Sequence, residues 1–142
     1  MRKKLSTLFL IAIVSLSSCD SMKKITSDPL SMLTSKTWGL ESLLGNAVDI
    51  NSFTSGIPSL LFSKDSKLSG FTGCNNFNGS FNLSGMGLGL DPGAMTKKAC
   101  AGDGEKNFLN ALSQVKSFDI SGDKLKLFGD AGKDLLSFLP IK

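Results

Sequence analysis

The sequence predicts an α+β protein in which a mainly antiparallel sheet of short strands packs against one amphipathic helix. Short runs of alternating apolar and polar residues recur between turn residues over most of the chain, which is typical of antiparallel strands. One segment near residue 110 instead has apolar residues at helical spacing. The chain has 142 residues, and the part that follows an N-terminal export signal fits a single domain.

The first 18 residues have the layout of a secretory signal peptide. Three cationic residues at positions 2–4 precede an apolar run over 5–16, which is too short and too interrupted by serine to span a bilayer of about 30 Å. The four residues Leu16-Ser17-Ser18-Cys19, which begin at the last residue of this run, resemble the bacterial lipobox. In that motif the cysteine is acylated and becomes the first residue of the mature protein. We therefore predict a lipid on Cys19, which would hold the protein permanently on a membrane.

A lipid anchor places the protein in the bacterial cell envelope, and we expect the outer rather than the inner membrane. Asp20 follows the anchor. In some bacteria an aspartate at this position retains lipoproteins in the inner membrane, whereas in other bacteria the sorting rule differs. Three of the 16 cationic residues leave with the signal, so 13 remain against 12 acidic residues and the net charge is +1. A nearly neutral chain with scattered lysines predicts no nucleic-acid binding.

Residues 19–36 are predicted to be a lipidated N-terminus followed by a flexible tether. The segment is polar and rich in serine, it is interrupted by Pro29, and it has no sustained periodicity. The folded domain is then expected over residues 37–142.

Within this domain the predicted strands follow one another with clear turns between them. A first strand over 37–44 turns at Gly45-Asn46 into a second strand. A hairpin is predicted around Lys64-Asp65-Ser66. The remaining strands are expected after that hairpin and at the end of the chain, before and after a turn at 129–133. The predicted strands cover residues 37–44, 47–50, 58–63, 67–73, 80–85, 86–90, 124–128 and 134–141.

The helix is predicted over residues 105–117. Phe108, Leu112 and Val115 recur at helical spacing, and Leu109 widens the apolar stripe. About three turns of helix would therefore lie with this stripe against the sheet.

The charged residues around this helix allow two interpretations. Asp103 can cap its start, Glu105 lies in the positive first turn, and Lys116 lies near the negative end. Alternatively, Asp103 and Glu105 could work as an acid and base pair in a hydrolase. We favour capping, because this is where a helix start favours negative charge.

The composition excludes several kinds of catalytic and metal site. The chain has no histidine and no tyrosine, so it cannot form Ser-His-Asp or Cys-His arrangements or histidine metal sites. Two mature cysteines are too few for a four-cysteine zinc site. We therefore predict no catalytic residue, no metal and no cofactor.

Cys74 and Cys100 are the two thiols that remain after acylation of Cys19. Export into an oxidising compartment makes them a candidate disulfide pair. Two buried thiols or one reactive cysteine are the alternatives, although no histidine is present to lower a thiol pKa. The asparagines and glycines near Cys74 favour a tight, irregular turn over 75–79.

Several stretches of the chain together resemble one protein family. They are Trp38 with Leu40 and Glu41, then LSGFTGCNNFNGSF, MTKKAC, FLNAL and GDKLKLFGDAGKDLLSF. In this combination the chain resembles the META domain, the HslJ-like bacterial lipoprotein family, over residues 35–140. The most specific matches are Gly73, Cys74, Asn75 and Gly79, together with Thr96, Ala99 and Cys100. Lys98 departs from the family, which usually has methionine at this position.

The resemblance implies a compact, strongly curved and barrel-like sheet with one helix. It brings no established catalytic residues, and members of the family are associated with heat shock, antibiotic tolerance and envelope integrity. We therefore expect a monomeric, non-enzymatic envelope lipoprotein that contacts the membrane through its lipid anchor. It would bind a partner protein or an apolar ligand between the helix and the sheet and serve in envelope stress or integrity. The alternatives are a structural or chaperone-like stress domain and a carboxylate-dependent hydrolase.

Overall fold

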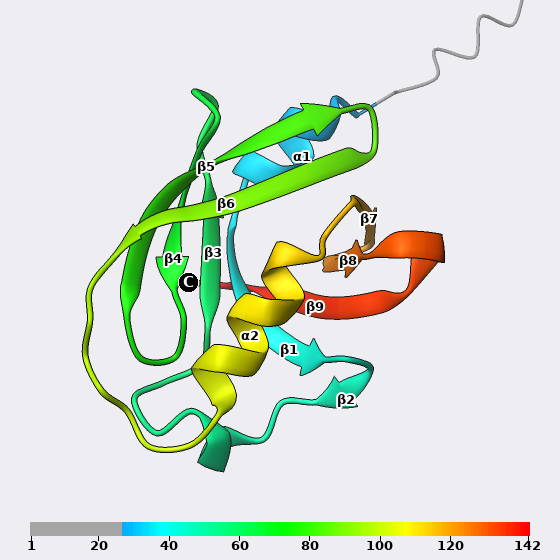
Figure 1. Ribbon diagram of the computed structural model, residues 1–142. Coiled ribbons are helices and arrows are strands. Elements are labelled where there is room, and N and C mark those ends of the chain that lie inside the picture. The colour runs from blue at the N-terminus through cyan, green and yellow to red at the C-terminus, as the bar shows by residue number, and fades with distance from the viewer. Residues whose placement is uncertain (1–26) are drawn as a thin grey trace, which may run out of the picture.

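The computed structural model describes residues 27–142, so the predicted signal peptide and Cys19 lie outside the described residues. Its strands join into one antiparallel sheet that curves around a central core (Figure 1). The strands are β1 Thr37–Leu43, β2 Asn46–Ala47, β3 Ser59–Phe62, β4 Lys67–Phe71, β5 Asn76–Ser84, β6 Gly87–Met95, β7 Ser117–Ser121, β8 Lys124–Phe128 and β9 Asp134–Ile141. The helices are α1 Pro29–Thr34 and α2 Gly104–Ser113, with 3-10 turns η1 Ile50–Ser52 and η2 Asp130–Gly132.

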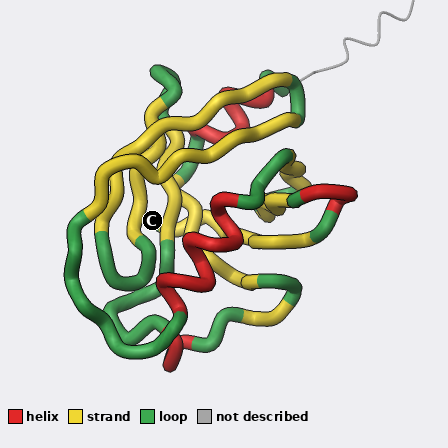
Figure 2. Tube along the Cα trace, in the orientation of Figure 1, coloured by secondary structure: helices red, strands yellow, loops and turns green. Residues whose placement is uncertain are grey.

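The sheet closes into a ring. Its strand order is β1-β3-β4-β5-β6-β7-β8-β9, and pairing of β1 with β9 joins the two ends, while β2 extends from β1 as a short hairpin. The narrowest seam lies between β6 and β7, which share the single pair Gly87 and Ser117. Helix α2 crosses the curved sheet beside this seam (Figure 2). The predicted α+β class with a curved antiparallel sheet and one main helix is therefore confirmed.

The core fills the space inside the ring. Phe108, Ala111 and Leu112 of α2 are buried, with at most 1% of each residue exposed. Leu125 and Leu127 of β8 are buried alternately, as the period of two predicts. Leu68 of β4 and Phe77 and Phe81 of β5 belong to the same core. The buried phenylalanines belong to this core: Phe53, Phe62, Phe77, Phe81, Phe108, Phe118 and Phe138.

The prediction of a flexible tether up to residue 36 is wrong for its last part. Residues 29–34 form the short helix α1, whose N-cap Asp28 accepts a hydrogen bond from the Ser31 amide. Leu33 is fully buried, and its carbonyl accepts a hydrogen bond of 2.9 Å from the Trp38 indole. Tertiary packing thus fixes a helix too short to show periodicity in the sequence.

The predicted C-terminal end of the main helix is also wrong. The helix ends at Ser113, and residues 117–121 form strand β7, which pairs along its length with β8. Val115 is buried as expected, but from the connection after the helix. Lys116 does not lie in the last turn; its amide donates to the Phe128 carbonyl and continues the β7–β8 ladder.

The region around residues 76–79 differs as well. It was predicted as an irregular turn, but it is the first part of β5, which pairs with β4 through Asn76 to Ser80. Strand β6 is correspondingly longer, ending at Met95. Gly79 permits a close approach of these strands, since a Cβ there would lie 1.9 Å from the Asp91 carbonyl oxygen. Within residues 27–142, neither helix has the length and apolar character needed to cross a membrane.

Candidate functional site

Two of the motif residues, Asn75 and Thr96, meet in a hydrogen-bonded cluster around the Asn75 side chain, and Asn75 is 3% exposed. Its amide nitrogen donates to the Lys98 carbonyl and to the Glu105 carboxylate. Its amide oxygen accepts from the Thr96 hydroxyl and the Lys98 amide. Both donors and both acceptor positions of the amide are therefore in use. This group of residues, called the Asn75 cluster below, comprises Thr72, Asn75, Thr96, Lys98 and Glu105.

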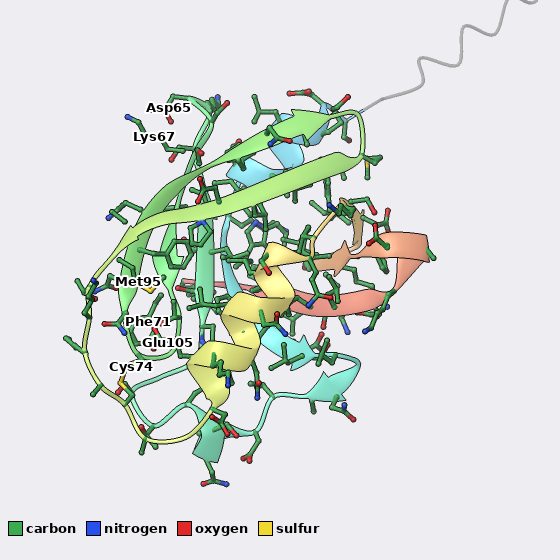
Figure 3. All side chains as sticks on the ribbon, viewed as in Figure 1. Asp65, Lys67, Phe71, Cys74, Met95 and Glu105 are labelled. Carbon is green, nitrogen blue, oxygen red and sulfur yellow. A yellow bond between two sulfur atoms is a disulfide. The ribbon has the colours of Figure 1, made fainter. Side chains whose placement is uncertain are left out.

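Glu105 ties the start of helix α2 into this cluster. Its carboxylate accepts hydrogen bonds from the Thr72 hydroxyl and the Asn75 amide. It lies in the first turn of the helix, as predicted, but its bonds go to the β4–β5 connection (Figure 3). Asp103 is the N-cap residue, but its side chain makes no capping hydrogen bond, so that part of the prediction is wrong.

A disulfide lies beside the Asn75 cluster and joins Cys74 to Cys100, the predicted pair. The two Cα atoms are 5.9 Å apart, and Cys74 is 2% exposed. The bond connects the turn before β5 to the long loop between β6 and α2. Gly73 has a φ of 91° and faces Phe53, whose ring a Cβ would approach to 2.3 Å, so this turn requires glycine. Together these contacts indicate a structural staple.

The other predicted motif residues also have structural positions. Trp38 is fully buried beside α1, and Gly79 lies where β5 and β6 approach closely. Ala99 is exposed in the loop that Cys100 anchors. The motif residues thus fix the long loop and the helix start.

The sequence predicted an apolar binding surface between the helix and the sheet, but side chains fill this space. Phe108 and Leu112 are completely buried there, and Leu109 packs partly buried against the same core. The helical stripe is therefore core. Hollows of about 320 Å³ beside Ser113 and about 170 Å³ beside Gly104 remain at the two ends of the helix, and a larger apolar surface lies on the outside of the ring.

Such a surface is a groove of about 460 Å³ on the outer face of the ring. Three segments far apart in the sequence contribute aliphatic side chains to it. Ile57 is 44% exposed, Leu139 39% and Ile141 48%. This surface, called the outer groove below, is lined by Gly39, Leu40, Glu41, Ala47, Val48, Ile57, Leu139, Pro140 and Ile141.

The groove exists because β1 changes partners along its length. On one edge β1 pairs with β3 only through residues 37–39 and with β2 only through Ser42 and Leu43. Between these pairings the β2–β3 connection keeps single backbone bonds to Leu40 and Glu41. On the other edge a bulge between Leu40 and Ser42 shifts the register with β9. At Leu40 and Glu41, β1 therefore has no continuous strand pairing on the edge that faces β2 and β3, and the groove lies there.

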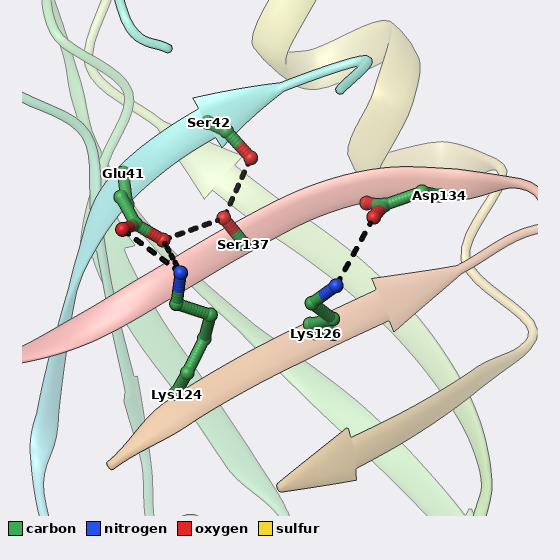
Figure 4. A network of polar contacts seen from close by, with 6 residues as sticks. All are labelled: Glu41, Ser42, Lys124, Lys126, Asp134 and Ser137. Carbon is green, nitrogen blue, oxygen red and sulfur yellow. Dashed lines mark hydrogen bonds and ion pairs between the residues drawn. The ribbon is translucent and has the colours of Figure 1, made fainter. Parts of the chain in front are cut away.

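One end of the outer groove is polar. Glu41 and Ala47 also line an adjoining hollow of about 270 Å³, which contains Lys124, Ser137 and Asp134. The Lys124 ammonium lies 2.8 Å from one oxygen of Glu41 and 3.0 Å from the other (Figure 4). The Ser137 hydroxyl donates to the same carboxylate over 3.0 Å. An apolar trough thus continues into a hydrogen-bonded charged network.

A family profile for the META domain matches residues 31–140. The chain belongs to the META domain family. Among curated proteins, no chain matches this sequence.

Three solved structures share the fold of this chain. One NMR structure is 26% identical and has a TM-score of 0.61; the match covers 79% of this chain and 95% of the other chain. An NMR structure from Burkholderia xenovorans is 22% identical, covers 100% and 99%, and has a TM-score of 0.60. A crystal structure of a DUF4847 family protein from Bacteroides vulgatus is 14% identical, covers 75% and 93%, and has a TM-score of 0.60.

In this META domain the residues at the polar end of the groove lower the pKa of Glu41. The hydrogen bond from Lys124 holds the pKa of Glu41 below its ordinary value, against the opposing effect of burial, and Ser137 adds to the lowering. The Glu41–Lys124 pair therefore stabilises the folded state at pH values above the ordinary pKa of glutamate. This contribution is lost as the pH falls through the lowered pKa of Glu41. The contribution is small, because about a third of the Glu41 side chain is exposed.

Replacing Lys124 by methionine is expected to raise the Glu41 pKa toward its ordinary value. Carbon-13 NMR titration of the Glu41 carboxyl measures this shift. Lys126→Met is the matched control, because Lys126 acts on Glu41 only through its charge and is the weakest contributor. Equal shifts in the two variants would contradict the assigned hydrogen bond.

The groove residues could not be found by sequence reasoning. Only Leu40 and Glu41 appeared in the family resemblance, and no motif marks Ile57, Leu139 or Ile141. The pairing of Thr37 with Ile141 and of Gly39 with Leu139 brings the C-terminal strand beside the first strand, and no local pattern shows that closure.

Proposed function

We propose that this META domain is a non-enzymatic binding module, held on a bacterial envelope membrane by a lipid on Cys19. It binds an apolar ligand, or an apolar segment of a partner protein, in the outer groove. The observation that carries this proposal is the meeting of three exposed aliphatic side chains, Ile57, Leu139 and Ile141, in one groove. Concave apolar surfaces with a few polar groups at one side are typical ligand sites.

The state of the carboxylates supports binding rather than catalysis. Glu105 is bonded to Thr72 and Asn75, and Glu41 is bonded to Lys124 and Ser137. A general acid or base works best with a pKa near the operating pH. The pKa of Glu41 is instead lowered by its hydrogen bond with Lys124, and the Glu105 carboxylate is hydrogen-bonded to Thr72 and Asn75. A role in envelope stress or integrity would then depend on what the groove binds.

The anchor is tested by replacing Cys19 with serine. The variant is expected to lose its lipid and to leave the membrane fraction, because acyl chains provide the only stable attachment in this proposal. Fractionation and intact mass measure both effects, and Ser21→Ala, outside the lipobox, serves as control. Retention of Cys19→Ser in the membrane fraction with unchanged mobility would exclude a lipid on Cys19.

The binding role is tested by native mass spectrometry of the protein isolated gently from its own cells. The wild type is compared with Ile57→Asp and with the control Ile50→Asp. Ile50 is 67% exposed and does not line the groove, whereas Ile57 is 44% exposed and does. Both sites are exposed enough for the variants to fold. The wild type and Ile50→Asp should carry the same bound species, and Ile57→Asp should lack it. The proposal fails if all three proteins are equally loaded or equally empty.

A further inference from the structure

We propose that the outer groove binds the aliphatic chain of a single-chain acyl lipid, whose polar head lies beside Glu41 and Lys124. This inference rests on the proposed function and names the class of ligand. Three features of the groove carry it: the chemistry of its lining, the shape of its floor and the polarity of its end.

The lining favours a flexible aliphatic chain. Its apolar side chains are aliphatic, from Ala47, Val48, Ile57, Leu139 and Ile141, and it contains no aromatic residue and no arginine. Binding energy at protein interfaces concentrates on tryptophan, tyrosine and arginine in packed pockets. A surface without them offers little to a protein partner but suits the non-directional burial of methylene groups.

The floor of the groove is formed by the paired strands β1 and β9, which contribute residues 39–41 and 139–141. Gly39 has no side chain there, and Ile141 lies directly over it, since a Cβ on Gly39 would come within 2.6 Å of the Ile141 side chain. Ile57 and Val48 lie on the opposite wall, on the connection between β2 and β3. The floor is therefore an extended strand pair, along which a single acyl chain can lie.

The polar end supplies donors for a head group rich in oxygen. The Lys124 side chain is 40% exposed in the polar hollow and is paired with Glu41, which lines both hollows, so its ammonium is accessible beside Glu41. Lys126 lies in the same hollow and is paired at 3.6 Å with Asp134. A carboxylate or phosphate head could accept from these ammonium groups while its chain lies over Ile57 and Leu139. Free fatty acids and lysophospholipids share this chemistry.

The test uses the mature chain with Cys19→Ser, so that its own lipid is absent, and with the disulfide intact. Dodecanoate and a twelve-carbon lysophosphatidylcholine, both below their micelle concentrations, are titrated by calorimetry and by methyl NMR. At least one probe should bind saturably in a one-to-one ratio and shift the methyl signals of Val48, Ile57, Leu139 and Ile141. Binding of dodecanoate alone would assign free fatty acids, and binding of the lysolipid alone would assign phospholipid.

Matched variants locate the site. Ile57→Asp should weaken binding at least tenfold, because it places a charge in the apolar wall, whereas Ile50→Asp should change affinity less than twofold. Lys124→Met should weaken binding several-fold without changing the fold. Unsaturable binding, or equal effects of Ile57→Asp and Ile50→Asp, would overturn the inference. If neither probe binds while Ile57→Asp still loses the species carried from cells, the acyl-lipid inference fails and the proposed function stands.

Discussion

Replacing Asn75 by alanine is expected to lower the free energy of unfolding by about 3–5 kcal/mol, since four part-buried hydrogen bonds are lost and each contributes about 0.5–1.5 kcal/mol. The side chain donates to the Lys98 carbonyl and the Glu105 carboxylate and accepts from the Thr96 hydroxyl and the Lys98 amide. Losing these bonds also frees the loop after β6 from the start of α2.

Urea unfolding followed by circular dichroism measures this loss. The control is Asn78→Ala, which changes an exposed asparagine three residues later, on strand β5. Its effect should stay within about 0.5 kcal/mol. Similar small losses in both variants would show that the Asn75 cluster contributes little to stability.

Removing the Cys74–Cys100 disulfide should have an effect of similar size. The bond closes a loop with a sequence separation of 26 residues, for which chain entropy gives about 3–4 kcal/mol. The double variant Cys74→Ala with Cys100→Ala removes the bond without leaving a free thiol. Its unfolding midpoint should fall, and reductant should lower the wild-type midpoint by a similar amount while leaving the variant unchanged. A wild type whose midpoint is the same before and after complete reduction would contradict the staple role.

The elements with strong local patterns were predicted well from the sequence. Strand β8 alternates lysine with leucine, and the Lys64-Asp65-Ser66 turn separates β3 from β4 as expected. The errors lie where local pattern and tertiary contact differ. The apolar stripe of α2 continues through Val115 toward Phe118, so the sequence alone extends the helix, whereas pairing with β8 makes residues 117–121 a strand.

The candidate site was less predictable for a related physical reason. The disulfide could be predicted because a predicted export signal and a pair of thiols favour it, whatever the fold. The outer groove depends on ring closure, which places Leu139 beside Gly39, and on a bulge at Glu41. Ring closure is stabilised by contacts between residues that are distant in the sequence. Hydrophobic periodicity reports only on neighbouring residues, so it cannot show this pairing. Helix α1 was missed similarly, because Leu33 is held by its burial and its bond to Trp38.

The most direct measurement is photo-crosslinking from residue 57 in intact cells, with residue 50 as the control. A photoreactive amino acid replaces Ile57 in one strain and Ile50 in the other, and mass spectrometry identifies the adducts. Both positions lie in the same connection between β2 and β3, but only residue 57 faces the outer groove. A defined adduct at residue 57, absent at residue 50, is the predicted result. Adducts that are identical at both positions, or absent from residue 57, would contradict the claim that this META domain acts by binding in the outer groove.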